Sequence, residues 1–585
     1  MVGNLTNSSI AQNQNWEKAV QKYGQLEQLS RGLIAIPTDK GGIYVGWRLL
    51  ARDPDGIAFN LYRNDGNGSV TKLNDHPIKN STDYLDENAP TGEKLSYTVK
   101  PIIQGKEGDA CESYEITSQD KHSDSYLSIK LNGNDDFQKV GIADLDGKGG
   151  YDFVIKQPDT NIDPWYKYWR PSGGTYTLEA YRHDGKSLWT YDLGWSIERG
   201  IWYSPYVVYD LNGDGQAEVA VKTGEGDPRD EEGRVKSGPE YLTILDGMTG
   251  QPIDQADWIS RQPFYDINPP DPASPLTRGY NHSSRNQLGI AYLDGEHPHL
   301  IEERGTYDLI IVRAYRLIEG SLKLVWEWDN RDAPDYYWGQ GAHWLHSADV
   351  DQDGRDEVIL GSAVLDNDGT ELWSTGLGHP DACYVGDLDP DRPGLEIYYV
   401  IETGQSDGNG MCMVDAKTGQ IIWGIDAPTN HVHGKGLCSD IDRVHPGREC
   451  YGAESGHGPI DFAIMHNSKG EIIDRDLMGN SPLCVHWDED NQRELLIGGE
   501  IFDYRGEATY TKIEGNVIAI ADIFGDWREE IITSVEGEIR IYTSTIPAND
   551  RRNCLMQDPI YRIEVAHASM GYESVPTTTY PLPWK

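Results

Sequence analysis

The feature that most constrains the fold of this chain is an Asp-rich turn followed by an apolar strand, which recurs along most of its length. Successive copies begin 34 to 84 residues apart. The blades of a β-propeller, each built from about four strands, repeat with a period of this order. The repeat therefore predicts an all-β chain dominated by an eight-bladed β-propeller. The eight copies begin at or near Asp144, Asp210, Asp294, Asp349, Asp387, Asp440, Asp488 and Asp522.

The copy at Asp349 shows why these turns suggest calcium. Carboxylates stand at positions 1, 3, 5 and 9, as Asp349, Asp351, Asp353 and Glu357, and Gly354 permits a sharp bend. Alternate residues of such a turn can direct several oxygen atoms toward one point, which is the chemistry of a hard cation. An EF-hand is disfavoured because its closing Glu stands at position 12 and helices flank it, whereas apolar β runs flank this turn.

The same pattern, in full or in part, predicts several Ca²⁺ ions that are mostly structural. A metal-free turn remains the alternative for any single copy, because Asp and Gly favour turns on their own. That alternative is about even for the copies at Asp488 and Asp522, since Phe524 replaces a ligand in the latter. The remaining predicted ligands are Asp144, Asp146 and Asp152; Asp210, Asn212, Asp214 and Glu218; Asp387, Asp389, Asp391 and Glu396; Asp440, Asp442 and Glu449; and Asp522, Asp526 and Glu530.

The sequence before the repeats predicts two further parts. Residues 1–30 contain an amphipathic pattern from Trp16 to Leu29, which indicates one helix. Residues 31–123 show short alternating runs between turns, which is the pattern of a fibronectin-type-III-like β-sandwich. The propeller is expected over 124–585, with its main insertion at 223–287.

Charge and composition exclude several classes of function. The chain holds 95 Asp and Glu against 51 Lys and Arg, a net charge of −44, whereas binding to nucleic acid or to an anionic membrane surface needs cationic faces. Its 17 Trp and 34 Tyr argue against a disordered acidic chain. No apolar run of about 18 residues predicts a membrane-spanning helix. The first 15 residues lack a signal peptide's apolar region, so we expect either a cytoplasmic protein or a secreted one whose signal has been removed. None of the seven cysteines forms a CxxC pair, which disfavours zinc and suggests free thiols.

Several longer strings stand out, including RGLIAI at Arg31, VGWRLL at Val45, GDLDPDRPGLE at Gly386 and GDWREE at Gly525. These strings resemble a known family, the rhamnogalacturonan lyases of polysaccharide lyase family eleven, and the resemblance extends from about residue 30 to 580. It implies a calcium-loaded eight-bladed propeller after a fibronectin-like domain. It also implies β-elimination at a rhamnosyl–galacturonate bond of an acidic plant cell-wall polysaccharide, leaving an unsaturated uronate.

The family's reaction needs a neutralised uronate carboxylate, a base for the C5 proton and a stabilised leaving oxygen at C4. The resemblance implies Lys512 as base or carboxylate clamp, Tyr572 as proton donor or sugar contact, and Lys435 as carboxylate partner. His343 and His379 stand in family-like strings and are further cleft candidates, although a propeller histidine can equally brace a turn. Further candidates for sugar contact are Lys156, Lys222, Arg285, Thr511 and the aromatic run 165–169, and those for an alternative base are His431, His433 and His457.

Departures from the family pattern keep the substrate open. They fall at 156–159, 304–309 and 509–512, positions that face the cleft in the resemblance. The chain could therefore act on another rhamnose- and uronate-containing glycan. A glycosidase on the same scaffold, which would use paired carboxylates and release saturated sugar, is a second alternative. A non-catalytic carbohydrate-binding propeller is a third. We expect a monomer.

Overall fold

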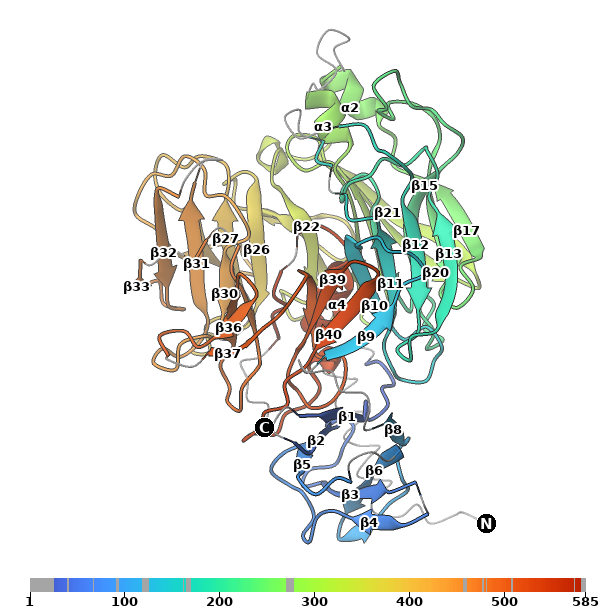
Figure 1. Cartoon of the computed structure of the whole chain (residues 1–585). Coiled ribbons are helices and arrows are strands. Elements are labelled where there is room, and N and C mark those ends of the chain that lie inside the picture. Colours follow the sequence, from blue (N-terminus) through green and yellow to red (C-terminus); the bar gives the residue numbers. More distant parts are fainter. Residues whose placement is uncertain are drawn as a thin grey trace, which may run out of the picture.

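The computed structural model describes most of the chain from residue 26 to residue 579. The residues that it does not describe are 1–25, 39–40, 67, 91–93, 118–125, 161, 165–169, 270–277, 456–459, 476–477, 480, 507–508, 573 and 580–585. β-Strands dominate the described part, which confirms the all-β prediction (Figure 1).

The N-terminal domain is a β-sandwich, as the alternating runs predicted. Its two sheets pack across a core in which Val45, Trp47, Phe59, Leu61 and Tyr97 are fully buried. One sheet contains β1 (Ile34–Pro37), β2 (Ile43–Gly46) and β5 (Asp83–Asp86). The other contains β3 (Ala58–Asn64), β4 (Val70–Lys72), β6 (Lys94–Ile103), β7 (Lys106–Glu107) and β8 (Tyr114–Thr117).

The rest of the described chain forms eight antiparallel sheets of four strands each, in sequence order. The first four are β10 (Lys139–Ala143), β11 (Asp152–Gln157), β12 (Thr177–Tyr181), β13 (Ser187–Asp192); β14 (Tyr206–Tyr209), β15 (Glu218–Gly224), β16 (Glu240–Asp246), β17 (Pro252–Asp257); β18 (Asn286–Ala291), β19 (His299–Arg304), β20 (Ile311–Ile318), β21 (Ser321–Asp329); and β22 (Gly341–Ala348), β23 (Glu357–Gly361), β24 (Ala363–Leu365), β25 (Glu371–Ser374).

The other four sheets continue this order, and the last takes its fourth strand from the other end of the domain. β9 follows the sandwich in sequence and pairs with β40 near the C-terminus, so the two ends of this part of the chain meet in one sheet. The strands are β26 (Pro380–Gly386), β27 (Glu396–Ile401), β28 (Met411–Asp415), β29 (Ile421–Gly424); β30 (Leu437–Ser439), β31 (Glu449–Glu454), β32 (Phe462–His466), β33 (Ile472–Asp474); β34 (Leu483–Val485), β35 (Glu494–Ile497), β36 (Glu500–Phe502), β37 (Thr509–Lys512); and β38 (Asn516–Ala521), β39 (Glu530–Val535), β40 (Glu538–Tyr542), β9 (Tyr126–Lys130).

Helix α4 (Pro559–His567) lies among the first strands of five sheets, since it contacts β10, β14, β18, β22 and β38 (Figure 1). Asp558 caps its N-terminus by accepting a hydrogen bond from the Tyr561 amide, and Pro559 fits the first turn because that turn needs no amide donor. The shorter helical segments are α2 (Gln262–Ile267), α3 (Arg278–Ser283), η1 (Asp335–Tyr337) and η2 (Leu555–Gln557).

Each of the eight Asp-rich turns connects the first strand of a sheet to the second. All eight therefore lie at one end of the sheets, while the start of each first strand and the end of each second strand lie at the opposite end. The sandwich domain packs against the Asp-turn end, where the Arg48 guanidinium donates to the backbone oxygens of Gly149 and Ile523.

The structure bears on two further predictions, the N-terminal helix and the lack of a membrane-spanning helix. Most of the helix predicted over Trp16–Leu29 lies outside the described residues, and residues 26–33 contain no helix, so the prediction is wrong for its last turn. Leu29 packs instead into the core around β10 and β11. Within the described residues, no helix is both long and apolar enough to cross a bilayer.

Candidate active site and metal-binding turns

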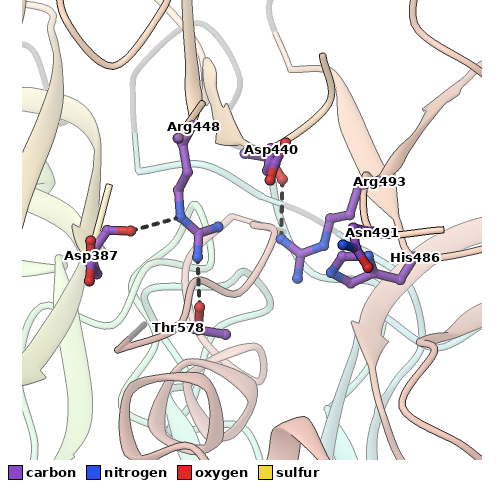
Figure 2. A pocket seen from close by; sticks show the side chains of 9 residues that line it. Asp387, Asp440, Arg448, His486, Asn491, Arg493 and Thr578 are labelled. Carbon is purple, nitrogen blue, oxygen red and sulfur yellow. Dashed lines mark hydrogen bonds between the residues drawn. The ribbon is translucent and has the colours of Figure 1, made fainter. Parts of the chain in front are cut away.

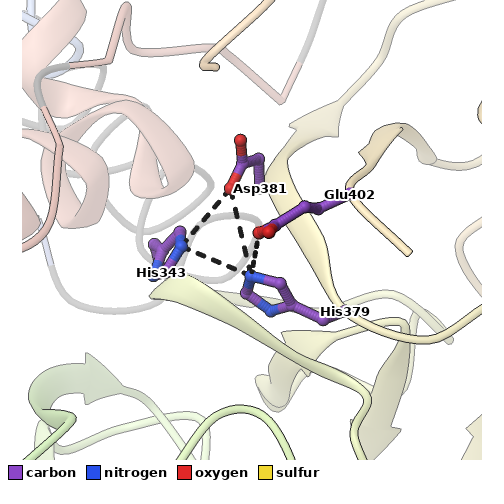
Figure 3. A group of neighbouring side chains, drawn as sticks. All are labelled: His343, His379, Asp381 and Glu402. Carbon is purple, nitrogen blue, oxygen red and sulfur yellow. Dashed lines mark hydrogen bonds and ion pairs between the residues drawn. The ribbon is translucent and has the colours of Figure 1, made fainter. Parts of the chain in front are cut away.

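Two histidines and two carboxylates form a mostly buried cluster (Figure 3). The cluster lies at the end of the sheets opposite the Asp-rich turns. His343 lies on β22, His379 precedes β26, Asp381 lies on β26, and Glu402 follows β27. The Nε2 atoms of the two histidines are 3.3 Å apart. His343 Nε2 lies 3.3 Å from Asp381 Oδ1, and His379 Nε2 lies 3.1 Å from Glu402 Oε2. We call these four residues the inner cluster.

Local backbone structure directs both imidazoles into the inner cluster. The register of β22 against β23 shifts between Gly341 and His346, so His343 lies in an irregular stretch of an otherwise regular strand. His379 Nδ1 contacts the Gly341 carbonyl oxygen. Because a carbonyl only accepts, Nδ1 carries the hydrogen and Nε2 presents a lone pair to the cluster.

The electrostatics of the inner cluster favour ionised carboxylates. Burial alone would raise the pKa of Asp381, but hydrogen bonds from His343 and His433 hold that pKa well below its usual value. Burial, with the nearby charges of His379 and Arg285, lowers the pKa of His343 and favours its neutral imidazole. Burial also opposes protonation of His379, but Glu402 and Asp381 outweigh it and raise the pKa of His379. Neutral imidazoles beside carboxylates are the ligands of divalent metal ions.

Aromatic and cationic side chains surround the inner cluster. The ring of Tyr572 lies 5.1 Å from that of His343 and 5.3 Å from that of Trp202, between centroids. Lys435 Nζ lies 5.9 Å from the centroid of the Tyr572 ring. Burial, together with the charge of Asp381, raises the pKa of Tyr572 well above its usual value, so its hydroxyl keeps a proton to donate.

Arg285 packs against the aromatic residues beside the inner cluster. Its guanidinium stacks 4.2 Å from the centroid of Trp202 and is ion-paired with Asp163 at 2.9 Å. The buried side chain thus orients Trp202 and adds positive charge near Tyr572.

Of the other predicted cleft residues, His431 and His433 also reach this cluster. His433 Nδ1 lies 2.8 Å from Asp381 Oδ2, and His431 Nε2 lies 3.4 Å from Glu402 Oε1. His457 and the aromatic run 165–169 lie outside the described residues.

Lys512 and Thr511 lie on β37, the fourth strand of their sheet. The direction of β37 places Lys512 at the same end of the sheets as the inner cluster. Its side chain is 70 % exposed and its Nζ lies 3.5 Å from Glu500 Oε1. None of the contacts described for Lys512 involves the inner cluster, so its predicted role rests on the resemblance alone.

Lys156 and Lys222, which we predicted to contact substrate, both have buried ammonium groups with partners inside the protein. Lys156 is buried and donates from Nζ to the backbone and side-chain oxygens of Ser204, at 2.9 and 3.1 Å. Lys222 is buried and its Nζ pairs with Glu240 Oε1 at 2.7 Å. Both ammonium groups are thus engaged inside the protein, where they brace neighbouring strands.

Glu240 is the shared partner of three buried cations. Besides Lys222, Arg261 and Arg304 each pair with its carboxylate at 2.7 Å. We expect Glu240→Gln to lower the free energy of unfolding by about 3–5 kcal/mol, because it leaves buried positive charges uncompensated. Chemical denaturation measures this. Glu327→Gln, which breaks an exposed pair with Arg313, is the matched control and should cost less than about 1 kcal/mol. Equal losses in the two variants would contradict this account.

The Asp-rich turns differ in how well they fit a calcium ion. Carboxylate oxygens converge within 4.8 Å in three of them: Asp144, Asp146 and Asp152; Asp349, Asp351 and Asp353; and Asp488, Asp490 and Glu494. In the second, Gly354 has the positive φ of +93° that its sharp bend requires. These all-oxygen sets fit Ca²⁺.

Buried carboxylate oxygens that lack hydrogen-bond partners also support calcium binding in the turns. Within the described chain, Asp152 Oδ2, Glu357 Oε1 and Glu449 Oε1 are buried without a hydrogen-bond partner. Burial, with the charges of Asp351 and Asp349, raises the pKa of Glu357 to about 9. Such a group holds a proton at neutral pH unless a cation replaces it, which is the expected behaviour of a metal ligand.

The protein's own cations contact acidic residues in several turns, including two of the convergent sets, where Lys148 pairs with Asp146 at 2.7 Å and Arg443 with Asp490 at 2.5 Å. In the turn at Asp522, the Asp526 carboxylate pairs with Arg528 at 2.7 Å and accepts a hydrogen bond from Tyr44 of the sandwich domain at 2.8 Å. Lys469 pairs with Asp389 and Asp391, and Arg505 pairs with Asp442 at 3.0 Å.

A small cavity lies among the turns that begin at Asp387 and Asp440 (Figure 2). Its volume of about 20 Å³ is room for about one water molecule. Arg448 and Arg493 line it, and Arg448 Nη2 donates to Thr578 Oγ1 at 2.7 Å. The cavity is at the Asp-turn end and is too small for a sugar.

Sequence reasoning missed Asp381 and Glu402, and it left Asp488, Asp490 and Glu494 out of the predicted ligands. Asp381 and Glu402 belong to no local motif, so only their positions on adjacent strands could have revealed them. The turn at Asp488 matches the repeat, but its sequence is equally compatible with a turn that binds no metal.

Comparison with known proteins agrees with this geometry. Residues 125–584 match the C-terminal domain of rhamnogalacturonan lyase family 11, and residues 24–117 match the β-sheet domain of rhamnogalacturonan I lyases. The rhamnogalacturonan endolyase YesW of Bacillus subtilis (strain 168) is 36 % identical over 610 residues, covering 96 % of this chain and 92 % of that protein. The exolyase YesX of the same organism is 35 % identical, covering 96 % of each.

Solved structures give the same result. The crystal structure of the exotype lyase YesX superimposes with a TM-score of 0.85 at 34 % identity, covering 96 % of this chain and 97 % of that one. The Bacillus licheniformis rhamnogalacturonan lyase PL11 gives the same TM-score, identity and coverage. Since matches to both domain models span nearly the whole chain, and full-length relatives exceed one-third identity, this protein belongs to rhamnogalacturonan lyase family 11 and is a polysaccharide lyase.

Proposed function

We propose that this chain cleaves the rhamnosyl–galacturonate bond of rhamnogalacturonan I by β-elimination, in a calcium-dependent reaction that leaves an unsaturated uronate. The observation that carries this proposal is the inner cluster of His343, His379, Asp381 and Glu402, packed beside Tyr572 and Lys435. The relatives YesW and YesX, whose names specify rhamnogalacturonan, support the substrate.

The inner cluster fits a divalent cation because it combines imidazole nitrogens with carboxylates in a mostly buried position. When bound there, such an ion would supply the positive charge that makes the C5 proton of a uronate acidic. Of the protein's own groups, His431 or His433, which are partly exposed beside the cluster, can take the C5 proton as the base. Lys435 adds positive charge next to Tyr572, and Tyr572 can donate its retained proton to the leaving oxygen at C4. Trp202, held by Arg285, packs against Tyr572 and keeps its ring in place.

We further infer that the eight four-stranded sheets are the blades of one closed eight-bladed propeller over 124–585, preceded by the sandwich over 31–123. The succession of contacts between the first strands β10, β14, β18, β22 and β26, the contact of β10 with β38, and the pairing of β9 with β40 support a ring. Calcium in the all-oxygen turns would then stabilise the blades at the end facing the sandwich.

Tyr572→Phe tests the role of the phenol. We expect kcat to fall about 10²-fold with KM little changed, because the variant keeps the ring that packs on Trp202 but loses the proton. Initial rates on rhamnogalacturonan I measure both constants. Tyr336→Phe, which alters an exposed tyrosine, is the control. A Tyr572→Phe variant with unchanged kcat would exclude the proton-donor role.

The variant Lys512→Ala tests the role of Lys512 in binding the polymer. We propose that Lys512 acts as a clamp on the polymer, since its ammonium is exposed at the same end of the sheets as the inner cluster. We therefore expect KM to rise several-fold and kcat to stay within a few-fold. Glu500→Gln, which frees the ammonium from its partner, should lower KM. A large fall in kcat for Lys512→Ala would instead identify Lys512 as the base.

A further inference from the structure

Tyr307 lies in the connection between β19 and β20, and its ring packs against both histidines of the inner cluster. The centroid of the ring is 4.6 Å from that of His379 and 5.9 Å from that of His343. The connection is at the same end of the sheets as the cluster, because it follows the second strand of its sheet. A third sheet thus brings an aromatic ring to two candidate metal ligands.

Two contacts fix the orientation of the His379 imidazole. Its Nδ1 donates to the Gly341 carbonyl oxygen, and its Nε2 then lies 3.1 Å from Glu402 Oε2. The Tyr307 ring packs against the same imidazole with an angle of 58° between the two ring planes. The hydrogen bond fixes one atom of the imidazole, and packing against a second ring fixes its plane.

The connection that carries Tyr307 also holds Gly341, whose carbonyl orients the imidazole. The Gly341 amide donates to the Thr306 carbonyl oxygen at 3.2 Å, one residue before Tyr307. Gly305 bends the backbone there with a φ of +101°, and a Cβ at this position would lie 2.0 Å from a backbone oxygen of the same connection, so only glycine fits. Both restraints on His379 therefore depend on this short connection.

The Tyr307 ring is itself held by neighbours outside the inner cluster. The Arg285 guanidinium lies 5.4 Å from the centroid of the ring, and the ring of His282 lies 5.0 Å from it. A cation near an aromatic face is attracted by the electrons of the ring. The Gly305 amide donates to the Arg285 carbonyl oxygen at 2.7 Å, which joins the backbone of the two residues as well. Tyr307 thus has a fixed place from which it can orient the imidazole.

The Tyr307 hydroxyl takes no part in this arrangement. No hydrogen bond joins it to any residue that the structure describes. Removal of the oxygen should therefore leave the ring and the fold unchanged, whereas removal of the ring opens a gap beside His379. Substitutions can thus separate the ring from the hydroxyl.

We propose that Tyr307 is a positioning residue, whose ring holds the His379 imidazole so that Nε2 points into the inner cluster. This inference rests on the proposed function, in which calcium at the inner cluster supplies positive charge for the elimination. Residues that orient a metal ligand from behind typically contribute about 10–100-fold to metal affinity or activity. The contribution of Tyr307 should therefore appear in calcium binding and not in binding of the polymer.

Two substitutions of Tyr307 in the full chain test this role. Tyr307→Phe keeps the ring, and Tyr307→Leu removes it. For Tyr307→Leu we expect the Ca²⁺ concentration that gives half-maximal activity on rhamnogalacturonan I to rise about 10–100-fold, while KM for the polymer at saturating Ca²⁺ stays within about twofold. Tyr307→Phe should match the wild type in both quantities. Tyr307→Met, whose flexible side chain fills the gap without a ring, should behave like Tyr307→Leu and replaces it if that variant does not fold.

Calcium counts give a second readout, which does not depend on activity. Each protein is dialysed against Ca²⁺ at about three times the concentration that half-saturates the inner cluster of the wild type, and its bound calcium is measured by elemental analysis. Tyr307→Leu should hold at least about half an ion fewer per chain than the wild type, and Tyr307→Phe should hold as many.

Tyr336→Leu is the matched control, because Tyr336 also lies in a connection at this end of the sheets but packs on Tyr337, and it should behave like the wild type. A Tyr307→Leu variant with the calcium activation and calcium count of the wild type would overturn the positioning role while leaving the lyase function standing. A Tyr307→Phe variant as impaired as Tyr307→Leu would overturn it as well, because the hydroxyl would then be the group that matters. A wild-type protein that forms no unsaturated uronate would refute the proposed function instead, and the calcium counts would still decide the role of Tyr307.

Discussion

Asp381→Asn is expected to lower kcat at least about 10³-fold, which is the largest effect of any single substitution that this account predicts. Asp381 is 1 % exposed and contacts both His343 and His433, so the substitution removes a buried negative charge that these two imidazoles share. The amide is nearly isosteric with the carboxylate, and the fold should therefore survive. Initial rates on rhamnogalacturonan I, with circular dichroism to check folding, measure the loss.

Asp294→Asn is the matched control for that substitution. Asp294 also pairs with a histidine, His297, at 2.9 Å, but on an exposed turn at the far end of the sheets. Its activity should stay within about twofold of the wild type, since surface ion pairs of this kind contribute little. An Asp381→Asn variant as active as Asp294→Asn would remove the inner cluster from the reaction.

Removal of calcium is expected to lower the melting temperature by about 7 °C. An ion present at about 100 times its dissociation constant stabilises the folded state by about 2.7 kcal/mol, and three all-oxygen turns would together contribute about 8 kcal/mol. A loss of that total shifts the melting temperature of a chain this large by about 7 °C. Thermal unfolding with and without chelator, followed by return of Ca²⁺, measures the effect.

Two glutamates at equivalent positions of different turns show which turns bind the ions. Glu357→Gln should reduce bound Ca²⁺ by one ion per chain, because Glu357 Oε1 is buried without a partner beside Asp349 and Asp351. Glu530→Gln should leave the count unchanged, because Arg528 already pairs with Asp526 in that turn. Elemental analysis gives both counts. Loss of one ion from both variants would show that Arg528 does not replace the metal.

The repeat could be predicted from the sequence because each copy is defined by residues that are close together in the chain. Each Asp-rich turn carries its acidic residues within about ten positions, so spacing alone located all eight strand connections. The alternating runs around Trp47 and Phe59 likewise predicted a sandwich, because burial on one face of a strand leaves a period of two. Both predictions concern residues that interact with near neighbours in sequence.

Contacts between strands were not predictable from local sequence. Asp526 resembles a calcium ligand, and the Tyr44 hydroxyl that donates to it is 482 residues away. Lys222 resembles a cleft cation, and its partner Glu240 lies on the neighbouring strand. Asp381 and Glu402 gave no signal at all, because the inner cluster exists only once β26 and β27 pair and β22 lies alongside.

The central claim is that the inner cluster belongs to a lyase that eliminates, rather than hydrolyses, a uronate bond. Its most direct test is the ultraviolet absorbance of the products of rhamnogalacturonan I, supported by their masses. The account predicts rising absorbance from a C4–C5 double bond conjugated to the carboxylate, abolished in Asp381→Asn. Saturated oligosaccharides one water heavier, with no gain in absorbance, would contradict it.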